Sequence, residues 1–141
     1  ALPILVRQPV ILLDTHALIW WVGGDARLSA PVAKLIKQNL AEHSVLISAI
    51  SAWEVAQLVA RDRLVLSRPV SDWLGLVQAI DGVRFVPIDH RVAVESVSLP
   101  GDFHKDPADR FLVATARLLG ATLVSCDDKI RAYAHVNTFW S

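Results

Sequence analysis

Four acidic residues stand at comparable places in this chain, each where an apolar run gives way to a helical pattern. The first ends the run ILLD and the last follows LVSC, while the other two lie near the starts of SAWEVAQL and PADRFLVATA. These residues are Asp14, Glu54, Asp109 and Asp127. A set of carboxylates without paired histidines or cysteines suits Mg2+ or Mn2+ better than zinc.

Helix capping is the alternative role for each of these acids. SAWE has the pattern of a capping box, in which Glu54 bonds back to the backbone of Ser51. DPAD offers Asp106 as a cap, a proline in the first turn, and Asp109 as an acid that the helix dipole favours. The other two acids could equally be caps. However, capping does not require charge, because serine, threonine and asparagine cap as well as aspartate does.

Electrostatics favours a shared function if the four acids converge. Two unit charges about 5 Å apart repel by roughly 3 kcal/mol at an effective dielectric constant of about 20. Several such pairs would cancel much of the net stability of a domain, which is about 5–15 kcal/mol. Raised pKa values or a bound divalent cation would offset the repulsion. Such a cation activates water and neutralises the charge that develops on a phosphate, which is the chemistry of phosphodiester hydrolysis.

Short β-branched runs alternate with longer helical patterns along the chain. Strands are predicted at residues 10–14, 45–50, 83–88, 121–126 and 136–140. Helices are predicted at residues 15–22, 30–43, 51–63, 70–80, 89–99, 107–120 and 127–133. This alternation predicts an α/β fold, a three-layer sandwich with a central, mainly parallel sheet of about five strands. Since parallel strands all end at one edge of the sheet, the four acids should share that edge.

Composition sets further expectations. The 141 residues, 53% of them hydrophobic, fit a single domain spanning residues 1–141. We interpret residues 1–9 as a leader into the first strand, part of which could be foreign to the natural protein. The single cysteine, Cys126, fits a reducing cytoplasm, and no apolar run is long enough to span a membrane. The formal net charge of zero provides no overall attraction to nucleic acid.

The segments VILLDTHALIW, ISAISAWEVAQL and KDPADRFLVATARLLGATLVSCDDKI closely resemble the PIN domain, in particular the VapC-type toxins of bacterial type II toxin–antitoxin systems. The resemblance covers nearly the whole chain from Val10 onward. It assigns catalytic and metal-binding roles to Asp14, Glu54, Asp109 and Asp127. It implies a PIN-like, Mg2+- or Mn2+-dependent endoribonuclease that leaves a 5′-phosphate and a 3′-hydroxyl. It also implies a homodimer that a cognate antitoxin protein inhibits.

Several neighbouring residues are predicted to support such a site. The candidates for a supporting role beside the four acids are Thr15, Asp106, Ser125 and Asp128. Lys105 and Arg110 are the candidates for contact with RNA. We interpret His16 as a hydrogen-bonded scaffold residue rather than a metal ligand.

Two other functions were weighed against a nuclease. A non-catalytic PIN-fold module that binds a protein partner would use the acids only as caps. A receiver-like phosphoacceptor domain shares the α/β plan, but it needs paired acids after the first strand and a lysine after the last. ILLDTH and VNTFWS supply neither. The nuclease is therefore the prediction, and the binding module is the alternative.

Overall fold

The fold is an α/β sandwich with a five-stranded sheet whose strands lie in the order β3-β2-β1-β4-β5. The computed structural model describes residues 9–141, so the predicted leader lies outside the described residues except for Pro9. All four strand pairings are parallel. The strands are β1 (Ile11–Leu13), β2 (Val45–Ser48), β3 (Val83–Val86), β4 (Thr122–Val124) and β5 (Thr138–Phe139). The helices are α1 (Thr15–Gly23), α2 (Ala30–Ala41), α3 (Ala49–Ala60), α4 (Val70–Gln78), α5 (His90–Val97), α6 (Pro107–Leu119) and α7 (Asp128–Ala132).

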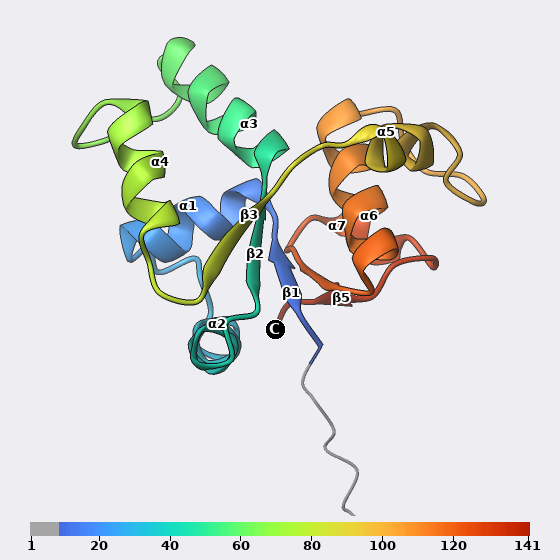
Figure 1. Cartoon of the computed structure of the whole chain (residues 1–141), viewed down its shortest axis with the longest axis horizontal. Helices are drawn as coiled ribbons and strands as arrows, with labels where there is room; N and C mark the ends of the chain where they lie inside the picture. Colours follow the sequence, from blue (N-terminus) through green and yellow to red (C-terminus); the bar gives the residue numbers. More distant parts are fainter. Residues whose placement is uncertain (1–8) are drawn as a thin grey trace, which may run out of the picture.

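Helices cover both faces of the sheet, which confirms the predicted three layers. Helices α1, α2 and α4 lie on one side, and α5, α6 and α7 lie on the other (Figure 1). Because successive side chains of a strand point to opposite faces, each strand contributes to two cores. In β1, Leu12 packs with residues of α5, α6 and α7, whereas Ile11 and Leu13 pack with residues of α1, α2 and α4.

The register of the sheet aligns the ends of its three central strands. Leu13, the last residue of β1, pairs with Ile47 of β2 and Val124 of β4. The chain builds outward from β1 to β2 and β3, and then returns to the other side of β1 for β4 and β5. The order of the strands thus reverses between β1 and β4, which is where α/β sheets commonly bind ligands. Asp14 follows β1 directly, and Asp127 lies three residues after the end of β4.

The start of α3 differs from the prediction. The strand β2 ends at Ser48, whose Oγ accepts a hydrogen bond of 3.1 Å from the backbone N–H of Ile50 and caps α3. Ser51 is therefore inside the first turn and Glu54 is in the second, so the predicted capping box is wrong. The sequence ISAISAWE contains two serines three residues apart, and both have the side chain that a cap needs. The strand ends at the first of them.

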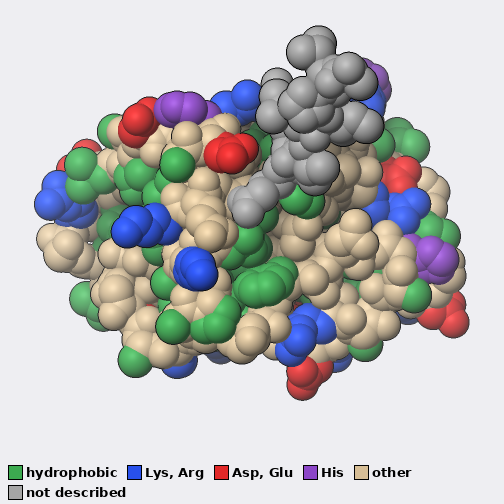
Figure 2. Space-filling model, turned by 90° about the horizontal axis from the view of Figure 1, so that it is seen from below, with side chains coloured by type: hydrophobic (Ala, Val, Ile, Leu, Met, Phe, Trp, Pro, Cys, Tyr) green, Lys and Arg blue, Asp and Glu red, His purple; other side chains and the backbone are tan. Residues whose placement is uncertain are grey.

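The opposite edge of the sheet, seen from below in Figure 2, shows acidic side chains scattered among basic and apolar ones rather than gathered together. Within residues 9–141, no helix combines the length and the apolar character that crossing a membrane requires.

Candidate active site

The carboxylate of Asp14 is buried at the end of β1, with only 6% of the residue exposed. It is the N-cap of α1, and its Oδ1 accepts a hydrogen bond of 2.8 Å from the backbone N–H of Ala17. The Ser125 hydroxyl also bonds to it, and both bonds favour the ionised form. Burial outweighs them and raises the pKa of Asp14. The residue is therefore held in a fixed orientation at an energetic cost to its charge.

Glu54 reaches the same edge from α3. Its Oε1 lies 2.5 Å from Thr15 Oγ1, which is also 3.0 Å from Ser51 Oγ. Because threonine has one hydroxyl proton and a carboxylate only accepts, Thr15 donates to Glu54 and Ser51 donates to Thr15. Burial raises the pKa of Glu54, and the nearby charges of Asp106 and Asp14 add to the rise. Thr15, which belongs to α1, thus helps to orient the side chain of Glu54 in α3.

Asp109 is the third acid of the cluster whose pKa is raised. It lies in the first turn of α6, and its backbone N–H donates a 3.0 Å hydrogen bond to Oδ1 of the N-cap Asp106. Burial raises the pKa of Asp109 to about 7, with further contributions from the charges of Asp106, Asp127, Glu54 and Asp14. The fold therefore brings together acids that lie more than a hundred residues apart in the sequence.

Asp127 closes the cluster as the N-cap of α7. Its Oδ1 accepts a 3.0 Å hydrogen bond from the N–H of Ile130, and its own N–H donates to Ser125 Oγ at 3.1 Å. Since Ser125 also bonds to Asp14, this buried serine joins the acids that follow β1 and β4. Asp128 is exposed in the first turn of α7 and lies beside this cluster.

Asp14 and Asp127 are both helix N-caps and members of the acid cluster. In Asp14 and Asp127 the capping bond uses Oδ1, and Asp14 also accepts a hydrogen bond from Ser125. Across the described part of the chain, however, no group of three or more Asp, Glu, His or Cys side chains is arranged to hold a metal ion directly. Direct ligation of one ion by three of the acids would therefore need some movement of their side chains.

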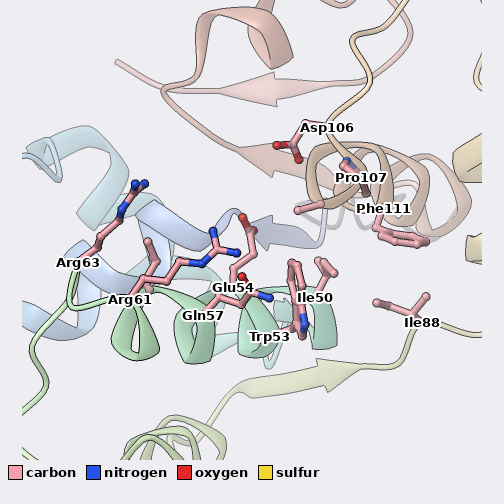
Figure 3. Close-up of a pocket in the computed structure, with 12 residues that line it drawn as sticks. Ile50, Trp53, Glu54, Gln57, Arg61, Arg63, Ile88, Asp106, Pro107 and Phe111 are labelled. Atoms are coloured by element: carbon pink, nitrogen blue, oxygen red, sulfur yellow. The ribbon is translucent and has the colours of Figure 1, made fainter.

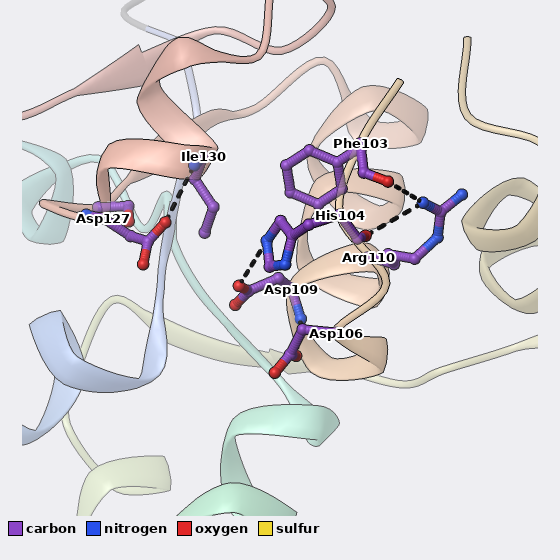
Figure 4. Close-up of polar contacts among 8 residues, drawn as sticks. Phe103, His104, Asp106, Asp109, Arg110, Asp127 and Ile130 are labelled. Carbon is purple, nitrogen blue, oxygen red and sulfur yellow. Dashed lines mark hydrogen bonds and ion pairs between the residues drawn. The ribbon is translucent and has the colours of Figure 1, made fainter. Parts of the chain in front are cut away.

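His104 is a neighbour of Asp109 that the sequence did not assign to the acids. Its Nε2 lies 3.0 Å from Asp109 Oδ2, and both side chains are about three-quarters buried, at 24% and 23% exposed (Figure 4). The geometry is not that of a hydrogen bond, so Nε2, shielded from solvent, has no such partner among residues 9–141. The contact depends on the loop between α5 and α6, which carries no regular pattern in the sequence.

The two candidates for RNA contact differ in their surroundings. Lys105 is exposed beside the acids. Arg110 is half-buried, and its guanidinium donates hydrogen bonds to three backbone carbonyls, those of Ser96, Phe103 and His104. Lys105 is therefore the more available of the two for a phosphate.

A groove of about 650 Å³ lies beside the cluster, between α3 and α6 (Figure 3). Glu54 and Asp106 line it on the side of the acids, together with Ile50, Phe111 and Ile88. Trp53, which is 54% exposed, also lines it. Two arginines, Arg61 and Arg63, lie at the end of the groove away from Phe111. The groove is thus mainly apolar, with acidic and basic groups at its margins.

Comparison with known proteins agrees with this fold. The PIN domain family model matches residues 11–136. Ribonuclease VapC22 of Mycobacterium tuberculosis is 39% identical over 127 residues, which are 89% of this chain and 92% of that protein.

Solved structures share the fold at lower identity. The crystal structure of VapBC2 from Rickettsia felis, bound to a DNA fragment from their promoter, has a TM-score of 0.68 at 12% identity, covering 93% of this chain and 98% of that chain. A toxin–antitoxin complex from Klebsiella pneumoniae has a TM-score of 0.59 at 19% identity, covering 89% of this chain and 94% of that chain. The family match over residues 11–136 and the 39% identical relative show that the chain belongs to the PIN domain family.

Proposed function

We propose that this protein is a divalent-metal-dependent endoribonuclease and the toxin of a type II toxin–antitoxin system. The observation that carries the proposal is the convergence of Asp14, Glu54, Asp109 and Asp127, expressed in the pKa of about 7 at Asp109. A fold does not need to gather like charges for capping alone. The similarity to ribonuclease VapC22 supports RNA as the substrate.

The donor set fits Mg2+ or Mn2+. Every candidate ligand is a carboxylate oxygen, and such ions are often held by one or two carboxylates while keeping several waters. Asp14, Glu54, Asp109 and Asp127 would hold the ion directly or through water. A cation in this place would supply charge neutralisation at the phosphate and a more acidic water.

The protein's own groups divide the remaining work. Asp14 and Glu54 are fixed by hydrogen bonds from Ala17, Ser125 and Thr15, so they hold their orientation without substrate. Asp109, in the first turn of α6 beside these acids, is the residue to which we assign the orientation of the attacking water. The exposed Lys105 is placed to contact a phosphate of the RNA.

An antitoxin protein is the partner that we propose for the groove between α3 and α6. The exposed Trp53 and the apolar side chains of Ile50, Ile88 and Phe111 offer a surface that a partner could bury. A partner seated there would lie next to Glu54 and Asp106 and would block access to the acids. We also propose, from the resemblance to VapC-type toxins, that the protein is a homodimer in the cytoplasm, and that residues 1–141 form a single domain. Light scattering of the purified protein measures the oligomeric state.

RNA cleavage tests the proposal directly. We expect the purified protein to cleave RNA with Mn2+ or Mg2+, and EDTA to abolish cleavage. Asp14→Asn should lose at least about a hundredfold of the activity. Asp72→Asn is the control, because Asp72 is an exposed acid in the first turn of α4, outside the cluster. Undiminished cleavage by Asp14→Asn would contradict the assignment of the site, whereas no cleavage by the wild type would favour the alternative, a non-catalytic module that binds a protein partner.

A further inference from the structure

Asp109 and Arg110 are consecutive residues of α6 whose side chains point to different sides of the helix (Figure 4). Asp109 faces the acids, and Arg110 faces the segment that joins α5 to α6. Arg110 Nε donates to the carbonyl of Ser96 at 2.8 Å, and one terminal nitrogen donates to those of Phe103 and His104 at 2.9 and 3.2 Å. These bonds fix both the end of α5 and the residues just before α6.

A second side chain holds the same segment further upstream. The Tyr133 hydroxyl, just beyond α7, donates to the carbonyl of Pro100 at 2.5 Å. The Tyr133 ring also packs against Phe103, with ring centroids 4.8 Å apart. Residues 98–106 contain no helix or strand, so their course depends on side chains of this kind. The hydrogen bonds of Arg110 hold this segment at Phe103 and His104.

The hydrogen bonds of Arg110 affect the position of His104 beside Asp109. With its backbone fixed by Arg110 and its ring packed 4.5 Å from that of Phe103, His104 places Nε2 3.0 Å from Asp109 Oδ2. The guanidinium therefore acts from the side of α6 that faces away from the acids. The Arg110 guanidinium thereby determines where the His104 imidazole contacts the carboxylate of Asp109.

We infer that Arg110 is a positioning residue of the acid site, which acts through the segment 98–106 to hold His104 against Asp109. The inference deepens the proposed function, on which its catalytic part rests. Lysine cannot replace Arg110 in this role, because an ammonium lacks the planar fork of donors that reaches several carbonyls at once. The competing explanation is that Arg110 only stabilises the fold.

The chain provides a matched control in Arg117, two turns later in α6. Its guanidinium donates to the carbonyl of His135 at 2.6 Å and to Glu95 Oε1 at 3.1 Å. Like Arg110 it bonds to a backbone carbonyl from the same helix, although it also pairs with a carboxylate, and its partners lie outside the segment 98–106. Arg110→Lys and Arg117→Lys therefore each remove guanidinium bonds of α6, and only the first should affect the acid site.

The first measurement reads His104 without any need for catalysis. Long-range 1H–15N spectra of the histidine rings are recorded at one fixed pH with EDTA, and His104→Gln assigns the signal. We expect Arg110→Lys to move the His104 signals toward those of the exposed His43 and His90, while Arg117→Lys leaves them in place. Tyr133→Phe, which removes only the bond to Pro100, should cause a smaller shift in the same direction.

The second measurement is a double-mutant cycle on RNA cleavage. Arg110→Lys and His104→Gln should each lower kcat by about tenfold to a hundredfold with little change in KM, because a small misplacement of a catalytic group is costly. The double variant should be no slower than the slower single variant, since both changes act through one contact. Additive losses, or equal losses in Arg110→Lys and Arg117→Lys, would overturn the inference.

The two proposals can fail separately. If the wild-type protein cleaves no RNA, the proposed function is contradicted, and the histidine spectra still decide whether Arg110 places His104. Unmoved His104 signals in Arg110→Lys contradict the inference even if RNA is cleaved. If Arg110→Lys does not fold, Tyr133→Phe carries the comparison of the His104 signals, and unmoved signals in that variant then contradict the inference.

Discussion

Thr15 Oγ1 lies 2.5 Å from Glu54 Oε1 and thereby joins the first turn of α1 to the second turn of α3. The two residues are 39 positions apart in the sequence and come from the helices that follow neighbouring strands. Ser51 extends the contact, 3.0 Å from the same hydroxyl. Glu54 therefore takes its orientation from a different helix as well as from its own.

Replacing Thr15 with valine should disorient Glu54 while preserving the shape of the buried side chain. We expect a loss of about 1–3 kcal/mol in unfolding free energy, because Ser51 and Glu54 lose a partner, together with lower RNA cleavage. Thr115→Val is the control, since Thr115 is also buried but bonds to the Phe111 carbonyl of its own helix. Urea unfolding and cleavage assays measure both effects. A greater loss of cleavage in Thr115→Val than in Thr15→Val would contradict this account.

The stability of the protein without divalent ions should fall as the pH rises from about 4 to 7. Asp109 keeps its proton up to a pKa of about 7 in the folded state, whereas the unfolded chain releases it near pH 4. Between these values the folded state binds more protons, so each pH unit weakens folding by up to about 1.4 kcal/mol. The raised pKa values of Asp14 and Glu54 act in the same direction.

Asp109→Asn should flatten this pH dependence, because asparagine does not ionise. Urea unfolding at several pH values with EDTA measures it, and the variant should be more stable than the wild type at pH 8 but not at pH 4. Asp102→Asn, at an exposed position in the segment 98–106 that precedes α6, should leave the curve unchanged. Parallel curves for the wild type and Asp109→Asn would refute the account.

Mn2+ should raise the melting temperature of the wild-type protein, since an ion that binds only the folded state stabilises it. At a free concentration one hundred times the Kd, the gain is about 2.7 kcal/mol. Asp14→Asn should lose most of the gain and Asp72→Asn should keep it, as measured by thermal unfolding over a range of Mn2+ concentrations. No gain in the wild type at millimolar Mn2+ would argue against a metal site.

Trp53→Ser should weaken binding of a protein partner without lowering the stability of the isolated chain. The side chain is 54% exposed in the groove, so its removal costs little in folding but deprives a partner of a large apolar contact. Leu76→Ser is the control, because Leu76 is 50% exposed on α4, away from the groove. Isothermal titration with the co-expressed partner compares the two variants, and equal affinities would place the partner elsewhere.

The sequence predicts the fold well because its different local patterns indicate the same strands and helices. The apolar runs, the helical spacing and Gly120, which ends α6 with a φ of 61°, all indicate elements that the structure contains. The sequence predicted the N-cap of α3 at Ser51 instead of Ser48. Both serines can cap a helix, and only the length of β2 decides between them. The meeting of the four acids was predictable, since parallel strands end at one edge.

The sequence could not predict what surrounds the acids. The contact of His104 with Asp109 depends on a segment without helix or strand, whose course is set by bonds from Arg110 and Tyr133. Arg110 was predicted to contact RNA, and nothing in its spacing indicates that its guanidinium would bond to backbone carbonyls. To predict such bonds, the path of the whole segment must be known, and local sequence patterns do not define it.

The order of the strands also has a consequence during synthesis of the protein. The central strand β1 pairs with β2 on one side and with β4 on the other, and β4 ends only at Val124. A chain still on the ribosome can carry Asp14 and Glu54 for some time before Asp109 and Asp127 have emerged. The incomplete chain holds half of the acids and an unpaired edge of β1. The acid site proposed for catalysis is therefore complete only after the chain has been translated beyond Asp127 and has folded.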